Sequence, residues 1–387
     1  MFRISRMQEL MKGLPRGTFE RFVSERQADK HSKGFGCWDQ LLAMVYAQLA
    51  GASSLRELTG GFNSQFTHHY HLGTVPIRRS TLAEANGKRS VDVFADAVRA
   101  LMAEARRRLR KDSQTLLYLL DSTSITLSGP GFDAWTKDNR TRHTQGIKLH
   151  LLLAAHEDRP VWQSITAPNV NDRDEGVKLA LEAGAIYVFD KAYCDYNWWH
   201  RIDQAEATFV TRFKRNAAVD VLRTLAVAEA GSVLEDALVR FRHKRPGGGR
   251  RNHYEAPLRR IVVAREAGAP LILATNDLTA PAESIARTYK DRWQIELLFK
   301  WLKQHLKVKR FLGRTENAVR IQILTALISY LLLALYRKTH GITHSLWELL
   351  AELRVTLFQR PSLEATRYRR RQEQLAEWSI RQPGLFA

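Results

Sequence analysis

Two short apolar runs constrain the fold of this 387-residue chain more than any other feature, because each ends in an aspartate. They are TLLYLLD, residues 115–121, and AIYVFD, residues 185–190. Apolar runs of this length predict buried strands. A carboxylate at the end of a buried strand is costly to desolvate unless a cation or hydrogen-bond donors meet it. If the two strands are neighbours, Asp121 and Asp190 lie side by side and favour a divalent cation between them.

The sequence between and after these runs predicts a mixed α/β architecture. Residues 146–155 and 160–168 are apolar segments joined by the turn HEDR, which predicts a hairpin. Residues 172–184 begin with acidic side chains and end in glycine, which is typical of a helix. A further helix over 197–207 and a strand over 208–213 complete the order strand, strand, strand, helix, strand, helix, strand.

The N-terminal region has a different sequence pattern, which predicts helices. Residues 1–112 contain short helical segments broken by glycine, with basic residues at the turns, such as Lys88 and Arg89. The formal net charge of +20 indicates a polyanionic partner, and nucleic acid is the usual one. We therefore predict a helical DNA-binding domain with Lys88 and Arg89 among its contacts. The pattern itself is weakly specific, because many helical domains share it.

Residues 214–282 form a third kind of segment, rich in predicted strands. Residues 257–266 and 269–277 predict a hairpin. Before them, RFRHKRPGGGRR at 240–251 gathers basic residues in a glycine-rich loop, where so many like charges cannot be buried together. We predict that this loop contacts DNA, and the alternative is a solvated loop tip without a partner. Its candidate DNA-binding residues are Arg242, Lys244, Arg245, Arg250 and Arg251.

The segment YKDRWQIELLFKWLKQ, residues 289–304, distributes its charges unusually. At about 100° per residue, five polar side chains share a stripe roughly 80° wide on an otherwise apolar helix. They are Tyr289, Arg292, Glu296, Lys300 and Lys303. A helix that is apolar nearly all round is buried, so the stripe should line a cleft or meet partners inside the protein. The alternative is an ordinary helix with ion pairs from Arg292 to Glu296 and from Glu296 to Lys300.

Glu296 is the third carboxylate of a predicted all-oxygen site. With Asp121 and Asp190 it would offer the hard ligands and open positions that suit Mg²⁺ or Mn²⁺. Two such ions about 3.5–4 Å apart can activate a water or a 3′-hydroxyl and stabilise the leaving oxygen of a phosphodiester.

Alternatives stay open for these carboxylates. Either aspartate could cap a turn, or a carboxylate pair could serve a glycosidase, although the basic pI argues against a neutral sugar. Nearby competitors for the metal-ligand role are Asp172, Asp174 and Asp195. The histidines His143, His150 and His200 show no metal-binding spacing, and we interpret them as structural.

Other features concern the cellular compartment. Cys37 and Cys194 lie far apart and form no metal-spaced pair, which favours a reducing compartment. The N-terminal residues contain no apolar segment typical of a signal peptide. The longest apolar run, residues 321–336, includes Gln, Thr and Ser and is short for a membrane span, so we predict a buried core helix.

Taken together, these segments resemble the bacterial insertion-sequence transposases of the IS-four family, which use a catalytic DDE triad. The spacing of Tyr289, Arg292, Glu296 and Lys303 resembles the Tyr-Arg-Glu-Lys signature of that family. LLDSTSI resembles the segment with the first aspartate, and YVFDKAYCDY followed by ATFVTRFKRNA resembles the segment with the second. The resemblance covers residues 115–335, and the long interval between the second and third acidic residues fits the family's β-rich insertion.

The resemblance implies an α/β fold with a ribonuclease-H-like catalytic core interrupted by a β-rich insertion, an N-terminal helical domain and a helical C-terminal region. The expected domains are the helical DNA-binding domain at 1–112, the core at 113–213 and 283–340, the insertion at 214–282 and the basic helical C-terminal region at 341–387.

The resemblance also implies cut-and-paste DNA transposition. The protein would bind the terminal inverted repeats of its element, cleave the double-stranded DNA and join the freed 3′-hydroxyl to target DNA, as a homodimer in the synaptic complex. It would act in the bacterial cytoplasm at the nucleoid, without a membrane partner. The implied site residues are Asp121, Asp190 and Glu296 as catalytic ligands of two Mg²⁺ or Mn²⁺ ions, and Tyr289, Arg292 and Lys303 as ligands of DNA phosphates. The alternatives are a ribonuclease-H-like DNA nuclease without strand transfer and a non-catalytic DNA-binding derivative.

Overall fold

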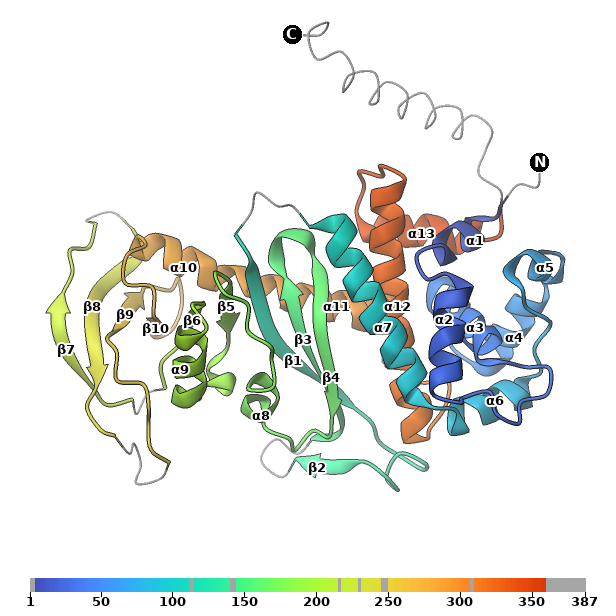
Figure 1. Cartoon of the computed structure of the whole chain (residues 1–387), viewed down its shortest axis with the longest axis horizontal. Helices are drawn as coiled ribbons and strands as arrows, with labels where there is room; N and C mark the ends of the chain where they lie inside the picture. The colour runs from blue at the N-terminus through green and yellow to red at the C-terminus, as the bar shows by residue number, and fades with distance from the viewer. Residues whose placement is uncertain are drawn as a thin grey trace, which may run out of the picture. The chain divides into compact units, whose positions relative to one another are not determined.

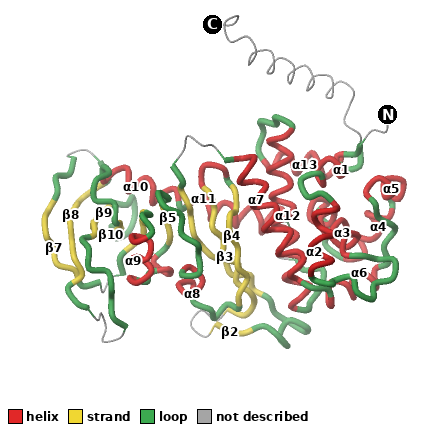
Figure 2. The backbone as a smooth tube through the Cα atoms, viewed as in Figure 1, coloured by secondary structure: helices red, strands yellow, loops and turns green. Residues whose placement is uncertain are grey.

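The computed structural model describes residues 4–110, 115–139, 144–214, 217–228, 231–244, 250–306 and 310–359. The chain forms two compact units. One is a helical unit of residues Met1–Leu109 and Leu302–Ala387, and the other is a sheet unit of residues Arg110–Trp301. Figures 1 and 2 show the helices and strands of both.

The helical unit joins the two ends of the chain. Its N-terminal part consists of α1 (Arg6–Met11), α2 (Arg16–Glu25), α3 (Cys37–Ala50), α4 (Leu55–Asn63), the 3₁₀ helix η1 (Phe66–His68), α5 (His69–Leu72), α6 (Arg79–Lys88) and α7 (Val91–Leu109). Its C-terminal part consists of α12 (Glu316–Thr339) and α13 (Leu346–Thr356). The start of α4 is capped by Ser54, whose hydroxyl accepts a hydrogen bond from the backbone N–H of Glu57.

Helix α12 is the core of the helical unit. It packs against α7, α3, α6, α1 and α13, and every residue from Ile321 to Tyr336 is buried. The helix is long and apolar enough to cross a membrane, but helices of its own unit cover it. Two of its buried polar side chains have partners: the Gln322 amide bonds the backbone of Leu312 and Arg310, and the Thr325 hydroxyl donates to the Ile321 carbonyl. The prediction of a buried core helix at 321–336 is therefore confirmed.

The sheet unit contains one ten-stranded mixed sheet in the order β2-β3-β1-β5-β6-β10-β9-β8-β7, with β4 paired to β3. The strands are β1 (Leu117–Thr126), β2 (Lys137–Asn139), β3 (Thr144–Ala154), β4 (Arg159–Thr166), β5 (Ile186–Phe189), β6 (Thr208–Arg212), β7 (Val219–Thr224), β8 (Val233–Phe241), β9 (Leu258–Val263) and β10 (Leu271–Thr275). Strands β4, β3 and β1 are antiparallel neighbours, whereas β5 runs parallel to both β1 and β6.

The helices of the sheet unit are mostly short. They are η2 (Ala155–Glu157), α8 (Asp172–Gly176), η3 (Lys191–Tyr193), α9 (Tyr196–Gln204), α10 (Ala282–Asp291) and α11 (Trp293–His305), and α11 runs across the boundary between the two units. Helix α9 contributes Trp198 and Trp199, which stack on Phe189 of β5 and Phe209 of β6 with ring centroids 4.6 and 4.8 Å apart. This aromatic cluster forms the apolar core beneath the parallel strands.

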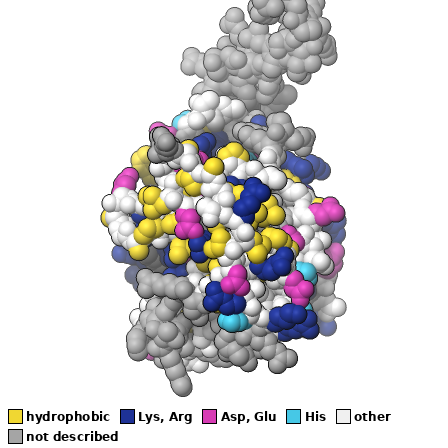
Figure 3. All heavy atoms as spheres, turned by 90° about the vertical axis from the view of Figure 1, so that its left-hand side faces the viewer, with side chains coloured by type: hydrophobic (Ala, Val, Ile, Leu, Met, Phe, Trp, Pro, Cys, Tyr) yellow, Lys and Arg dark blue, Asp and Glu magenta, His cyan; other side chains and the backbone are white. Residues whose placement is uncertain are grey.

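Strands β7 to β10, which come from the predicted insertion, extend the same sheet. Strand β10 pairs antiparallel with β6, so hydrogen bonding continues from the parallel strands into this segment. The predicted hairpin of 257–266 and 269–277 is confirmed by the pairing of β9 with β10. Figure 3 shows this end of the sheet unit, where apolar side chains lie among basic and acidic ones. Exposed apolar residues on its strands are Val221, Leu222, Leu234 and Ile272.

Two sequence predictions about helices were wrong. The predicted single helix over 289–304 is broken at Arg292, which follows α10 and precedes α11. The segment is also not buried on all its apolar faces, since Trp293 and Leu297 are 59% and 49% exposed. The predicted helix over 172–184 ends at Gly176, because the following backbone N–H groups of Lys178 and Leu179 bond three residues back as turns.

Candidate active site

Adjacent parallel strands place the two predicted aspartates. Leu120 of β1 pairs with Phe189 of β5, so Asp121 and Asp190 follow at the same level of neighbouring strands. Asp190 also caps η3, where its carboxylate accepts a 3.1 Å hydrogen bond from the backbone N–H of Ala192. Parallel pairing therefore brings together residues that lie far apart in the sequence.

Arg292 links the first aspartate to the glutamate of α11. Its Nη1 donates to Asp121 Oδ2 at 3.0 Å, and its Nη2 lies 2.6 Å from Glu296 Oε1. Arg292 occupies the break between α10 and α11, and this position lets its side chain reach β1 as well as the next turn of α11. The predicted Arg292–Glu296 ion pair exists, but it belongs to a wider cluster that includes a strand carboxylate.

The three carboxylates influence one another electrostatically. Burial, together with the negative charges of Asp190 and Glu296, raises the pKa of Asp121 to about 6. The Ser122 backbone N–H and the Arg292 guanidinium oppose this shift. The Arg292 guanidinium thus contacts two carboxylates, and Asp190 adds a third beside Asp121, which leaves a surplus of negative charge for another cation.

Tyr289 lies against this cluster. Its side chain is buried, and the Arg292 guanidinium carbon is 5.9 Å from the centre of its ring. Burial raises the pKa of the Tyr289 hydroxyl, and the charge of Asp190 acts in the same direction. Lys300 of α11 is exposed. Lys303 of α11 is half-buried and lies after Trp301, the last residue of the sheet unit. The sheet unit therefore gathers Asp121, Asp190, Glu296, Arg292 and Tyr289 at one place.

The chemistry of this cluster fits a divalent cation. All its acidic ligands are oxygens, the donors that Mg²⁺ and Mn²⁺ prefer. Among the described residues, no three side chains of Asp, Glu, His or Cys converge closely enough to enclose a single ion. Ligation by pairs of carboxylates, completed by water or by a DNA phosphate, is the arrangement that these oxygens can support.

The competing carboxylates have structural roles. Asp195 caps α9 and accepts a 2.9 Å hydrogen bond from Trp198 N, while Asp174 pairs with Arg173 on the surface. Asp172 is buried and pairs with Lys148 at 3.2 Å. Each of these aspartates has a local partner that accounts for its position.

The basic residues predicted at the end of α6 differ in their surroundings. Lys88 is exposed and pairs with Glu84 at 2.8 Å. Arg89 is enclosed: its side chain is 10% exposed, stacks on Phe35 and pairs with Asp29 at 3.7 Å. Its guanidinium is thus engaged within the helical unit, whereas Lys88 is the more accessible of the two predicted DNA contacts.

The glycine-rich loop keeps its basic residues at the surface. Arg242 pairs with Asp220 at 2.7 Å, Arg250 with Asp195 at 3.7 Å and Arg251 with Glu255 at 3.9 Å. Lys244 is exposed, and its backbone carbonyl accepts a 2.8 Å bond from Asn252 N that closes the base of the loop. Exposed pairs of this kind are weak, so these cations can exchange partners. Arg245 lies outside the described residues.

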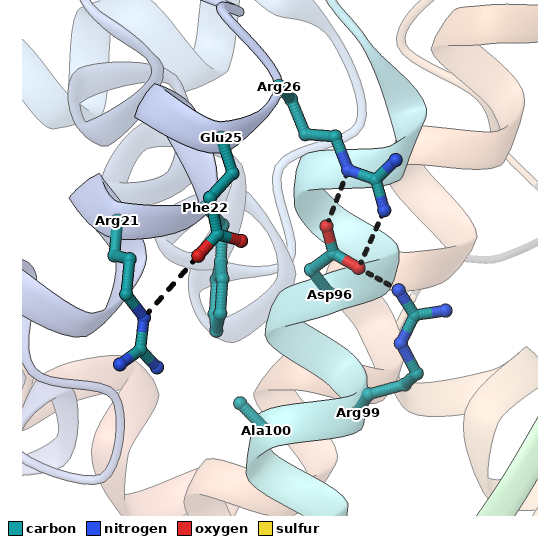
Figure 4. A pocket seen from close by; sticks show the side chains of 7 residues that line it. All are labelled: Arg21, Phe22, Glu25, Arg26, Asp96, Arg99 and Ala100. Carbon is teal, nitrogen blue, oxygen red and sulfur yellow. Dashed lines mark hydrogen bonds and ion pairs between the residues drawn. The ribbon is translucent and has the colours of Figure 1, made fainter.

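A hollow of about 520 Å³ in the helical unit gathers further charges between α2 and α7 (Figure 4). Asp96 lies between Arg26, 2.9 Å away, and Arg99, while Arg21 pairs with Glu25 at 3.9 Å. The three arginines of this hollow therefore all form ion pairs with its two carboxylates.

Sequence reasoning missed a polar cluster beneath the strands. Lys148 and His150 of β3 are buried, although both are polar residues in an apolar strand. Their alternation in the run KLHLLLA was the available signal, since alternate residues face the same side of a strand. The structural interpretation of His150 agrees with its burial, while His200 packs edge-on against Tyr254 and His143 lies outside the described residues.

Comparison with known proteins adds independent information. Residues 112–332 match the family model described as a transposase DDE domain, and residues 3–75 match a domain of unknown function. A putative transposase, y4zB, of Sinorhizobium fredii is 42% identical over 68% of this chain and 72% of its own length. A probable transposase for the insertion sequence element IS5377 of Geobacillus stearothermophilus is 30% identical over 66% of this chain and 68% of its own length.

Two further similarities are more distant. A putative transposase for the insertion sequence element IS4SA of Synechocystis is 29% identical over 66% of this chain and 71% of its own length. The piggyBac transposase synaptic complex with hairpin DNA has a TM-score of 0.47 and 11% identity, over 94% of this chain and 82% of that one.

Proposed function

The chain belongs to the transposase DDE domain family, and from that membership we propose that it moves an insertion sequence by a cut-and-paste reaction. The family relationship makes the protein a DNA transposase, an enzyme that cleaves and joins DNA. The proposal adds that it is of the IS-four kind, binds the terminal inverted repeats of its element and acts as a homodimer in the synaptic complex, in the bacterial cytoplasm at the nucleoid.

The observation that carries the proposed active site is the position of Arg292 between Asp121 and Glu296. The arginine of an ordinary surface helix would point to solvent or pair along its own helix. Arg292 instead contacts a half-buried aspartate on a strand. Here the contact joins the predicted first and third acidic residues, and the second lies beside the first on β5.

The strand pattern supports a ribonuclease-H-like core. Strand β3 pairs antiparallel with both β4 and β1. Strand β5 then pairs parallel with β1, and β6 pairs parallel with β5. Residues at the carboxyl end of adjacent parallel strands share one edge of a sheet, the usual position of an active site in α/β sheets. We accordingly propose that the core comprises β1 to β6 with α10 and α11, and that β7 to β10 form the family's insertion.

In the proposed mechanism, Asp121, Asp190 and Glu296 hold two Mg²⁺ or Mn²⁺ ions. When bound, these ions supply Lewis-acid activation of a water or a 3′-hydroxyl. Arg292, Tyr289 and Lys303 orient the phosphate. Hydrolysis breaks a P–O bond at the element's end and leaves a 3′-hydroxyl, which then forms a new P–O bond with a target phosphate as another P–O bond of the target breaks.

The test is to incubate the protein with its element's end DNA, a target plasmid and Mg²⁺, and to map the products. We expect cleaved ends and joined products from the natural protein. Asp121→Asn, Asp190→Asn and Glu296→Gln should each lose both while retaining DNA binding, because they remove ligands without removing basic contacts. The control is Asp174→Asn, which changes an exposed neighbouring carboxylate.

The rival functions predict other products. Cleavage without joining would identify a nuclease that lacks strand transfer, and binding without cleavage would identify a non-catalytic derivative. Natural-level cleavage by any of the three ligand variants would remove that residue from the proposed site.

A further inference from the structure

A polar network is buried beneath β1, on the side of the sheet opposite to Arg292. Ser122 and Ser124 alternate with Asp121 along β1, and they pair with His150 and Lys148 of β3, so these four residues share one face of the sheet. Lys148 is 4% exposed and His150 is fully buried. Ionisable side chains this deep in a protein are rare unless they have partners.

Lys148 and Asp172 form the charged centre of the network. The Lys148 ammonium donates to the carbonyl of Val170 at 2.8 Å and to Asp172 Oδ1 at 3.2 Å. The same Asp172 oxygen accepts a 2.7 Å hydrogen bond from the Ser122 hydroxyl. Ser122 directly follows Asp121, so this bond joins the middle of β1 to α8.

His150 continues the network towards the second aspartate. Its Nε2 lies 3.0 Å from the Thr166 hydroxyl, which donates to the Ala167 carbonyl, so Nε2 carries the proton and donates to Thr166. Its Nδ1 then accepts from the Tyr193 hydroxyl at 3.3 Å. Burial lowers the pKa of His150 to about 4, which keeps the ring neutral.

Tyr193 brings the network to Asp190. It is the last residue of η3, the 3₁₀ turn that Asp190 caps, and its side chain is fully buried. The Ser122 hydroxyl also hydrogen-bonds the Tyr193 hydroxyl, so polar contacts run from the residue after Asp121 to the turn that Asp190 caps. Asp172 and His150 are themselves close, with Oδ1 and Nδ1 3.6 Å apart.

We propose that this network is a positioning device that sets the separation of Asp121 and Asp190. The inference rests on the proposed metal-binding role of those aspartates. A buried ion pair contributes little net stability compared with well-packed apolar residues, so stability alone does not account for it. Hydrogen bonds behind metal ligands, by contrast, fix the orientation of those ligands and tune their affinity for the metal.

The test compares two buried tyrosines, Tyr193 of η3 and Tyr187 of β5. Tyr193→Phe removes the hydroxyl that bonds His150, whereas Tyr187→Phe removes one that accepts from Glu182 N at 2.8 Å, away from the aspartates. Calorimetric titration with Mn²⁺ measures the affinity of each variant, with Asp121→Asn as the baseline for loss of the site. We expect Tyr193→Phe to weaken Mn²⁺ binding by about tenfold or more, and Tyr187→Phe to match the natural protein.

A second pair of variants covers a failure of Tyr193→Phe to fold. Ser122→Ala removes the donor to Asp172, and its matched control Ser164→Ala removes a hydroxyl that bonds the buried Glu175 at 2.7 Å. Weaker Mn²⁺ binding in Ser122→Ala alone supports the proposal. Equal affinities within the pair overturn it.

The readout separates this proposal from the proposed function. Mn²⁺ affinity is measured without DNA, so it reports on positioning even if no strand transfer occurs. If Asp121→Asn binds Mn²⁺ as the natural protein does, the proposed metal site itself is wrong. If the natural protein binds Mn²⁺ and Tyr193→Phe binds it equally well, only the positioning role is overturned.

Discussion

Arg292 illustrates how one residue can have two opposite effects on a metal site. Its guanidinium neutralises part of the repulsion among Asp121, Asp190 and Glu296, and so lets these carboxylates coexist without a metal. The same positive charge repels an incoming cation. Once metal and DNA are bound, a guanidinium released from the carboxylates has the fork geometry that suits a phosphate.

This dual role predicts that Arg292→Ala binds Mn²⁺ more tightly and cleaves DNA more slowly. Loss of the competing charge should raise Mn²⁺ affinity by roughly tenfold. Loss of the phosphate contact should lower the cleavage rate by about 10²–10³. Calorimetry and single-turnover cleavage measure the two effects. Arg287→Ala, which removes an exposed arginine of α10, is the control, and a fall in metal affinity in Arg292→Ala would contradict the argument.

His150 predicts a particular dependence of stability on pH. Burial lowers its pKa to about 4, whereas a histidine in the unfolded chain titrates at about 6.5. Between these values the unfolded chain binds a proton that the folded chain does not, so stability falls as the pH drops through this window. The charges of Asp172 and Glu175 oppose the shift, while Lys148 and Lys178 add to it.

We therefore expect His150→Gln to lose less stability on acidification than the natural protein. The difference between the two unfolding free energies should change by about 1 kcal/mol per pH unit between pH 6 and 5. Urea denaturation at pH 7, 6 and 5 measures it, and His156→Gln changes an exposed histidine as the control. Parallel pH profiles for His150→Gln and the natural protein would show that His150 has the same pKa in the folded and unfolded chain.

At the scale of elements, local sequence patterns predicted the strands better than the helices. Strands β1 and β5 follow from their apolar runs, but β1 continues past Asp121 to Thr126, so only Asp190 directly follows the end of its strand as predicted. The break at Arg292 did not follow from sequence, because residues 282–305 have uninterrupted helical periodicity and the arginine's partner lies on β1, far away in the chain. The early end of α8 has a similar origin, since its buried acidic residues Asp172 and Glu175 bond to strand residues.

The glycine-rich loop provides a prediction about DNA affinity. Changing its described cations Arg242, Lys244, Arg250 and Arg251 to serine should weaken binding of end DNA and reduce the salt slope, because each lost phosphate contact releases fewer counterions. Arg242 and Arg251 pair with the exposed carboxylates of Asp220 and Glu255, and Asp195, the partner of Arg250, is also held by its cap of α9, so the fold should not depend on these cations. Fluorescence anisotropy at several salt concentrations measures the effect.

The matched control removes the same charge elsewhere in the sheet unit. It replaces four other exposed cations, Arg173, Arg201, Arg223 and Arg265, with serine. Circular dichroism should show an unchanged fold for both quadruple variants. If the loop variant binds with the same affinity and salt slope as this control, the loop is a solvated tip and the DNA follows another path.

For the whole molecule, the net charge of +20 makes salt the strongest external control of DNA affinity. A protein that neutralises several phosphates loses affinity by orders of magnitude between about 50 and 200 mM salt. We expect this behaviour for end DNA and for unrelated DNA alike, since most phosphate contacts do not read sequence. Binding that stays constant over this range would refute the electrostatic interpretation of the charge.

The larger arrangement shows where sequence reasoning reaches its limit. Composition and apolar runs predicted a helical part and a mixed α/β part. Predicted strands around a basic glycine-rich loop indicated the separate β-rich segment. The pairing of β10 with β6, which joins that segment to the main sheet, depends on hydrogen bonds between distant strands. The partnership of Lys148 with Asp172 likewise needed the fold, because either residue alone resembles an ordinary surface charge.

The helical unit is assembled from both ends of the chain, and this has a consequence for synthesis on the ribosome. Helices α1 to α7 emerge first, but α12, whose apolar surface they cover, is translated roughly two hundred residues after α7. At about 5–20 residues per second, the nascent N-terminal helices wait at least about ten seconds for their core. The sheet unit can be completed during that interval. A message truncated before α12 would thus release a chain whose first hundred residues expose apolar surface, a substrate for chaperones and proteases.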